Sequence, residues 1–262
     1  MDVAIPRQLE TAHLPYEVNP AYEPLTSRMY QVLASMVSYA ASLDGKSPHE
    51  FHVLDVGPGR GELMSLLAYN GYPVEGLDLD PVCVSMSSQY GPCQFGSTDD
   101  ITKTYSQNEF DLVVASHVIE HVRDPLGALE AFHYAASRWI LLAVPNPIRP
   151  LAIYKNLLRK PWSNPTHIAI WDHSHFANFL QLHAKLEIVR EESDYVEIIW
   201  GRLRSLLYRL GVLKPFSWME INLLPRLFPR FSTSIIALCR IPDQAWFIPP
   251  ERATGLSVER VT

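Results

Sequence analysis

The chain has 262 residues, of which 47% are hydrophobic and 19% are charged, and its formal net charge is -6. These values predict a folded domain with a substantial core, and they exclude a disordered or fibrous chain. The negative balance does not attract a polyanion, so we expect no nucleic acid partner. The three cysteines are scattered, which favours a reducing compartment. The N-terminus does not resemble a leader, and there is no apolar run of roughly 18 residues, so we expect a soluble, cytoplasmic protein.

The N-terminal part, residues 1–48, is predicted to be an arm followed by a capping helix. About the first twenty residues are polar, contain several prolines and show no sustained period, as is typical of a loop. Apolar residues then recur at helical spacing between positions 25 and 40, which predicts an amphipathic helix. We expect this helix to pack on or cap the domain that follows.

From residue 51, short β-type runs alternate with helical stretches. The runs are FHVLDV, PVEGLDLD, CQF, FDLVVAS and WILLAVP. This alternation predicts an α/β fold with parallel strands joined by crossover helices, and the apolar stretches LVVA and ILLAV favour strands buried on both faces. LEIVR and TSIIALC predict two further strands. The domain is therefore expected over residues 49–241, followed by a tail over 242–262.

The segment after the first strand is rich in glycine. Gly57, Pro58, Gly59 and Gly61 lie between a strand and a helix, where glycines permit positive φ and let a ligand approach the backbone. The third glycine comes one position earlier than in the dinucleotide fingerprint, and Glu62 stands in its place. The turn thus predicts a nucleoside-containing cofactor and disfavours a nicotinamide or flavin.

Two aspartates follow the second strand. Asp78 lies about twenty residues after the first glycine, where an acidic side chain can accept both ribose hydroxyls of such a cofactor. Asp80 precedes Pro81, an arrangement typical of a helix N-cap. We therefore assign Asp78 to the cofactor and Asp80 to the helix.

Four segments, VLDVGPGRG, GLDLD, FDLVVASHVIEHVRDP and LLAVPNP, resemble the class I S-adenosylmethionine-dependent methyltransferases. The resemblance covers about residues 51–146 and is greatest to small-molecule enzymes such as the ubiquinone-biosynthesis O-methyltransferases. It implies a doubly wound, seven-stranded, mostly parallel sheet with an antiparallel last strand. It also implies S-adenosylmethionine as cofactor and a small-molecule acceptor, with oxygen preferred. A silent cofactor-binding subunit and a nicotinamide-dependent enzyme remain alternatives.

Carried over residue by residue, the resemblance implies these cofactor contacts: Asp55, Gly57, Pro58, Gly59, Gly61, Asp78 and Leu79. Leu79 lies against the adenine in this assignment. Ser97 or Thr98 aligns with the position that reads the adenine amino group, whereas Asp99 is the better acceptor chemically. From the arm, Tyr22 and Arg28 are expected to reach the cofactor carboxylate.

The fourth strand leads into a polar cluster. Ser116, assigned to the cofactor, and His117 come at its carboxyl end, and Glu120 and His121 follow at spacings that converge on one helical face. Some similar enzymes bind a metal through E-x-x-E-H here, but His117 stands at their first glutamate. This change weakens a magnesium site and leaves a transition metal as an alternative, and we assign no metal ligand. A general base, His121 or His117, is favoured over a structural role. His167, in a later loop, is another candidate base.

A basic insertion over about residues 200–231 precedes the last strand. Residues 201–231 contain six Lys or Arg and one Glu, and Leu203, Leu206, Leu207 and Leu210 share a helical stripe. This composition is compatible with peripheral membrane or lipid contact or with an acidic substrate. We favour a lid helix that packs on the domain, with arginine stems covering apolar surface.

Overall fold

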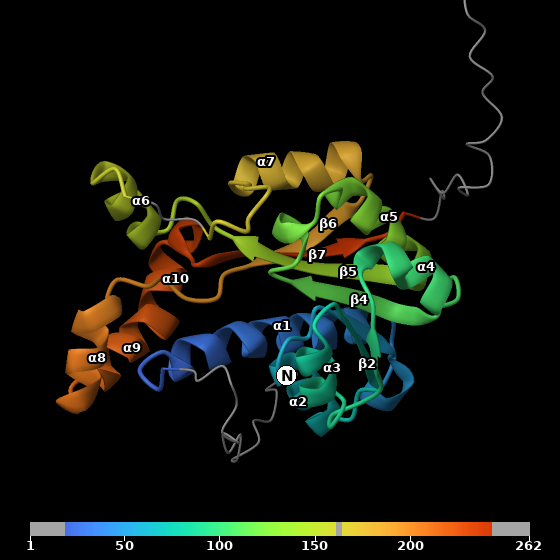
Figure 1. Ribbon diagram of the computed structural model, residues 1–262, viewed down its shortest axis with the longest axis horizontal. Coiled ribbons are helices and arrows are strands. Elements are labelled where there is room, and N and C mark those ends of the chain that lie inside the picture. The colour runs from blue at the N-terminus through green and yellow to red at the C-terminus, as the bar shows by residue number, and fades with distance from the viewer. Residues whose placement is uncertain (1–18, 161–163, 243–262) are drawn as a thin grey trace, which may run out of the picture.

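The computed structural model describes residues 19–160 and 164–242. Its strands are β1 Val53–Val56, β2 Val74–Asp78, β3 Cys93–Phe95, β4 Phe110–Ser116, β5 Ala136–Pro145, β6 Glu187–Glu192 and β7 Ser234–Arg240. They form one sheet in the order β3-β2-β1-β4-β5-β7-β6 (Figure 1). Strand β7 runs antiparallel to β5 and β6, and the other neighbours are parallel. The predicted seven-stranded, mostly parallel sheet with an antiparallel last strand is confirmed.

Helices cover both faces of this sheet. They are α1 Glu23–Leu43, α2 Glu62–Tyr69, α3 Pro81–Ser87, α4 Ile101–Thr104, α5 Pro125–Ala135, α6 Pro150–Leu157, α7 His173–Asn178, α8 Gly201–Arg209, α9 Lys214–Trp218 and α10 Leu224–Leu227. One-turn 3-10 segments lie at Pro48–Glu50, Thr98–Asp100, Ile119–His121 and Pro229–Phe231, and π-helical turns at Phe179–His183 and Met219–Leu223. Figure 1 shows α1, α2 and α3 on one face and α4, α5 and α7 on the other.

The central strands bury side chains on both faces. In β4, Val113 and Ala115 belong to the core beneath α5, whereas Leu112 and Val114 belong to the core shared with α1 and α2. Both pairs are fully buried, as the continuous apolar run predicted. The predicted amphipathic helix is confirmed as α1, which buries one apolar stripe. The boundaries of the arm, domain and tail stay predictions, and residues 1–18 and 243–262 lie outside the described chain.

The insertion between β6 and β7 is held by a buried ion pair. Arg204 of α8 and Glu220 of the turn after α9 are both fully buried and paired with each other. Glu220 Oε1 also accepts from the backbone N–H groups of Ile198 and Ile199, and Arg204 Nη1 donates to the carbonyl of Ala21 at 3.0 Å. This pair connects three segments that are far apart in the sequence.

The lid helix that we favoured is present as α8, but its apolar stripe does not pack on the domain. Leu203, Leu206 and Leu210 are 55%, 52% and 64% exposed, and Leu207 is half-buried. Arg204, next to Leu203 in the sequence, makes the buried contacts of α8 instead of the stripe.

We expect Arg204→Leu to lower the free energy of unfolding by about 3–5 kcal/mol, because it leaves the Glu220 carboxylate buried without its partner. Urea titration of the purified chain measures this change. The exposed pair Arg240 and Glu187 provides a matched control, and Arg240→Leu should cost less than about 1 kcal/mol. Equal losses in the two variants would contradict the role given to the buried pair.

Candidate active site

The glycine-rich turn follows β1 directly, at the edge of the sheet where the parallel strands end. Gly57, Gly59 and Gly61 have φ values of 72°, 58° and 83°, which disfavour residues with a Cβ. A Cβ at Gly57 would lie 2.5 Å from Val118 Cγ2, so the chain after β4 requires glycine there. A Cβ at Gly59 would meet no described atom within 4 Å. The backbone of Gly59 is therefore open to a ligand.

Asp78, at the end of β2, lies against this turn. Its Oδ2 accepts from Gly59 N at 3.0 Å, its Oδ1 accepts from Asp80 N at 2.9 Å, and its side chain is nearly buried. Each carboxylate oxygen keeps a free lone pair, so the geometry fits a ligand with two neighbouring hydroxyls. Asp80 Oδ1 accepts from Val82 N at 2.8 Å, which confirms Asp80 as the N-cap of α3.

Asp55 has a buried carboxyl group with an unsatisfied oxygen. It is 2% exposed, and its Oδ2 has no hydrogen-bond partner within residues 19–160 and 164–242. Burial, followed by the charges of Asp78 and Glu62, raises the pKa of Asp55 to about 8. An ammonium group at this position would supply the missing hydrogen bond and stabilise the ionised form. The residues thus fit the amino-acid end of S-adenosylmethionine.

Tyr30 of α1, which the sequence analysis did not single out, lies near the acidic groups of the glycine-rich turn. Burial and the nearby charges of Glu62 and Asp55 raise the pKa of its hydroxyl above the usual range. Tyr22, which we had expected at the cofactor, instead accepts from Gly201 N at 2.7 Å. The helical period of α1 could have indicated Tyr30, because it lies three and seven positions before the buried Leu33 and Val37.

Apolar surface is exposed where β2 and β3 end. Leu79 is 69% exposed. Phe95, the last residue of β3, pairs with Asp78 across the two strands and is 64% exposed. Two such side chains beside a ribose-binding carboxylate are suited to hold a flat aromatic base. Phe95 was missed because the last residue of a short strand carries no distinguishing sequence signal.

The three candidates for reading the adenine differ in their surroundings. Ser97 Oγ donates to Asp100 Oδ2 at 2.8 Å, so the Ser97 hydroxyl is already engaged in a local cap. Thr98 is buried, and Asp99 is exposed. Asp100 completes this capping box, since its carboxylate also accepts from Ser97 N at 3.0 Å. The choice between Thr98 and Asp99 stays a prediction.

A second cluster is centred on Glu120, just after β4. His117 has a left-handed backbone, with φ 57°, and the 3-10 turn at residues 119–121 follows it. Glu120 is 1% exposed, and its Oε1 lies 3.3 Å from His117 Nδ1 and 3.9 Å from His121 Nε2. His117 Nε2 lies 3.1 Å from Ser234 Oγ, while the half-buried Ser116 hydroxyl has no hydrogen-bond partner in the described segments. The predicted convergence around Glu120 therefore occurs.

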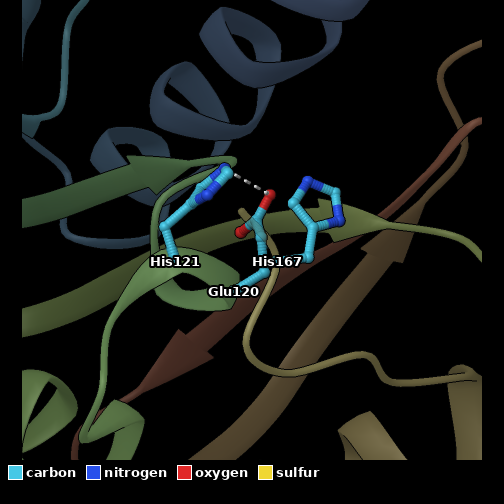
Figure 2. A group of neighbouring side chains, drawn as sticks. All are labelled: Glu120, His121 and His167. Carbon is cyan, nitrogen blue, oxygen red and sulfur yellow. Dashed lines mark ion pairs between the residues drawn. The ribbon is translucent and has the colours of Figure 1, made fainter. Parts of the chain in front are cut away.

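The loop after α6 adds His167 to this cluster. The N–H groups of Ile168 and Ala169 donate to the carbonyl of Glu120 at 2.7 and 3.2 Å, which holds the loop against the turn. The rings of His121 and His167 meet edge to face, with centroids 4.7 Å apart, and Figure 2 shows the Glu120 carboxylate between them. Desolvation lowers the pKa of His167, so this imidazole is neutral at pH 7.

This group also has the composition of a metal site. Glu120, His121 and His167 each offer one ligand atom, and these atoms lie within 4.8 Å of one another. Two imidazoles and one carboxylate suit a divalent transition metal better than magnesium. Our assignment of no metal ligand rested on His117, whereas the structure places His167 in the third position. A base and a metal ligand set are both compatible with this geometry.

A cavity of about 640 Å³ opens where β6 ends and β7 begins. Its lining includes Arg28, Arg230, Glu191 and Ile235, and Ile235 directly follows the Ser234 that contacts His117. Arg28, which we expected at the cofactor carboxylate, thus borders the cavity.

The model of one protein family, described as a methyltransferase domain, matches residues 25–189. This match covers more than half of the chain. The chain belongs to the methyltransferase-domain family. It is a class I S-adenosylmethionine-dependent methyltransferase, and S-adenosylmethionine is its cofactor, as the four sequence segments predicted. The alternative of a nicotinamide-dependent enzyme is not supported, and the comparison with the ubiquinone enzymes stays a resemblance.

Several solved structures share the fold of this methyltransferase. Magnesium protoporphyrin IX methyltransferase from Synechocystis with bound SAH has a TM-score of 0.57 and 17% identity over 87% of this chain and 90% of that chain. A putative sarcosine dimethylglycine methyltransferase from Galdieria sulphuraria has a TM-score of 0.54 and 16% identity, over 86% and 91%. The cyclase SpnF has a TM-score of 0.56 and 15% identity, over 87% and 85%.

At these identities the likeness to solved structures shows the fold alone. No curated protein matches the sequence. Because a cyclase is among the structures with this fold, the fold does not determine the acceptor.

We expect Gly59→Ala to weaken S-adenosylmethionine binding by roughly tenfold or more, because the added methyl group occupies the open face of the turn. Isothermal titration calorimetry measures the affinity. Gly45→Ala is a matched control, since Gly45 has a similar φ of 65° and open space around it. Both variants should lose about 1–2 kcal/mol of stability, but only Gly59→Ala should lose affinity. Unchanged affinity in Gly59→Ala would remove the turn from the cofactor site.

Asp55→Asn should separate stability from binding. The folded pKa of Asp55, about 8, lies above the 3.8 of an aspartate in the unfolded chain, so the cofactor-free protein binds a proton on folding between these values. The stabilisation that Asp55 contributes is therefore fully present below about pH 4 and is lost as the pH rises toward about 8. The variant should show a smaller fall in Tm over this window, yet bind S-adenosylmethionine about tenfold or more weakly. Parallel melting curves and equal affinities would contradict both roles of Asp55.

Proposed function

We propose that this methyltransferase transfers its methyl group to an oxygen of a small-molecule acceptor, with His167 as general base. The observation that supports this proposal is the group of Glu120, His121 and His167 at the same edge of the sheet as the cofactor turn. The sulfonium of S-adenosylmethionine supplies an activated methyl group, so the chain mainly has to align the acceptor and accept its proton.

His167 has the properties that a base at neutral pH requires. Desolvation lowers the pKa of its imidazole, which keeps a nitrogen lone pair available to the acceptor hydroxyl. As the oxygen bonds to the methyl carbon and the carbon–sulfur bond breaks, the hydroxyl proton passes to His167. The buried carboxylate of Glu120 stabilises the resulting imidazolium.

The other two histidines position this pair. His121 Nδ1 lies 3.0 Å from Thr166 Oγ1 and 3.3 Å from the Thr166 carbonyl, which orients its ring next to His167. His117 contacts Glu120 on one side and Ser234 on the other. Both are alternative bases, in keeping with the sequence prediction, but His117 has both ring nitrogens near partners within the chain, and His121 has its Nδ1 engaged by Thr166.

A metal-assisted reaction is the second candidate, favoured by the 4.8 Å span of the three ligand atoms. A divalent ion held by Glu120, His121 and His167 would lower the pKa of the acceptor hydroxyl and make a base unnecessary. The two candidates differ in their response to a chelator.

We expect His167→Ala to reduce kcat with a hydroxyl acceptor by about 10²–10⁴-fold and to remove the acidic limb of the pH–rate profile. Its affinity for S-adenosylmethionine should stay within about twofold of the parent, because His167 lies outside the glycine turn. A panel of hydroxyl, amine and carbon acceptors, monitored by S-adenosylhomocysteine formation, supplies the substrate. The exposed His183 is the matched control, and His183→Ala should retain full activity.

Two outcomes contradict the proposal. Turnover with amine or carbon acceptors alone would exclude the oxygen acceptor. Loss of activity with EDTA and its return with zinc or manganese would assign Glu120, His121 and His167 to a metal instead of a base.

A further inference from the structure

The insertion and α6 form one surface at the end of the molecule, which we call the helical end: residues 148–160 and 200–231. Figure 1 shows α6, α8, α9 and α10 gathered beyond the ends of β4 and β5. Tyr154 of α6 contacts Trp200, which precedes α8, with ring centroids 5.6 Å apart. Two segments separated in the sequence by β6 thus form a continuous surface.

Large apolar side chains are concentrated on this surface. Among the most exposed are Leu157 at 78%, Leu210 at 64%, Trp218 at 61%, Leu227 at 59% and Leu203 at 55%. The surface of a monomeric soluble protein seldom exposes so many large apolar groups together, and such patches mark interaction sites. The exposure follows from the anchoring of α8, because Arg204 faces the interior and the leucines point outward.

The charges of the helical end have a single sign. Every Lys and Arg of residues 148–160 and 200–231 other than Arg204 is at least partly exposed, whereas the only acidic residue in these segments, Glu220, is fully buried against Arg204. The whole chain has a net charge of -6, so positive charge is segregated to this end. Exposed apolar groups surrounded by Lys and Arg match the chemistry of an anionic bilayer surface.

The helical end also has the residues typical of a membrane interface. The side chain of Trp218 is more than half exposed, and those of Tyr154 and Tyr208 are nearly half exposed. Their amphipathic rings prefer the headgroup level of a bilayer. Arginine and lysine can extend their charged groups to the phosphates while their stems lie in the apolar layer. Over the described residues, no helix has the length and apolar character needed to cross a bilayer.

We propose that the helical end docks this methyltransferase peripherally on an anionic lipid bilayer. A protein partner or a second copy of the chain fits less well, because the uniformly positive rim would repel a copy of itself and favours a flat anionic surface. Docking places the edge of the sheet that carries the active site next to the bilayer. The proposal goes beyond methyl transfer and is independent of the acceptor atom and of the base.

Vesicle co-sedimentation of the full chain tests this docking. We expect binding to vesicles of equal parts phosphatidylcholine and phosphatidylglycerol, at least tenfold weaker binding to phosphatidylcholine alone, and loss of binding at high salt. The double variant Leu206→Glu and Leu210→Glu should bind the anionic vesicles at least tenfold more weakly. Because these leucines are exposed, its circular dichroism and its S-adenosylmethionine affinity should match those of the parent.

Tyr69→Glu and Leu182→Glu serve as matched controls, since both side chains are about as exposed but lie away from the helical end. Both controls should bind anionic vesicles like the parent chain. Absence of binding by the parent, or equal losses in the controls, would overturn the proposal. A parent dimer that dissociates in the leucine variant, without vesicle binding, would assign the surface to a second copy. Binding is measured without turnover, so failure here is distinguishable from failure of the proposed reaction.

Discussion

The parallel register of β1 between β2 and β4 is the constraint on which the rest of the site depends. Asp55 pairs with Gly76 on one side and with Val114 on the other, so the chain leaves β1 at the same level as Asp78 and Ser116 leave their strands. The turn must then bend away in very little space, because Val118 lies against Gly57. Glycine at this turn is therefore a consequence of sheet geometry before it is a requirement of the ligand.

The same geometry concentrates negative charge. Burial, followed by the charges of Asp78 and Glu62, raises the pKa of Asp55 to about 8, so its carboxyl group is mostly protonated at pH 7 in the cofactor-free protein. Three acidic groups around one turn are unfavourable for the cofactor-free fold and favourable for a ligand with a positive charge. We therefore expect part of the binding free energy of S-adenosylmethionine to come from its positive charge, which offsets the unfavourable burial of these acidic groups in the free protein.

The cluster of Glu120, His121 and His167 is assembled differently, from segments that the sheet alone does not bring together. Glu120 offers its carbonyl to Ile168 and Ala169, and this backbone contact brings His167 to its side chain. The helical end depends on one ion pair in a similar way, since Arg204 and Glu220 decide which side of α8 faces outward. In both places one buried glutamate organises a loop region, through its backbone carbonyl at Glu120 and through its carboxylate at Glu220.

Much of the fold and half of the site follow from the sequence by itself. Alternation of apolar runs with helical stretches determines the sheet, and Gly57, Gly59 and Asp78 mark the cofactor because strand–turn–helix geometry is local. The caps at Asp80 and Asp124 are equally local, and both are present.

Tertiary structure decided what depends on distant neighbours. His167 joins His121 across 46 positions of sequence through backbone hydrogen bonds that no motif encodes. Tyr30 and Phe95 acquire their places from packing and strand pairing. The sequence pattern of the leucine stripe of α8 is the same whether the stripe is buried or exposed. Periodicity indicates an amphipathic helix, but it does not indicate which side of the helix packs against the rest of the chain. The buried pair of Arg204 and Glu220 settles that question, and it forms only in the folded chain.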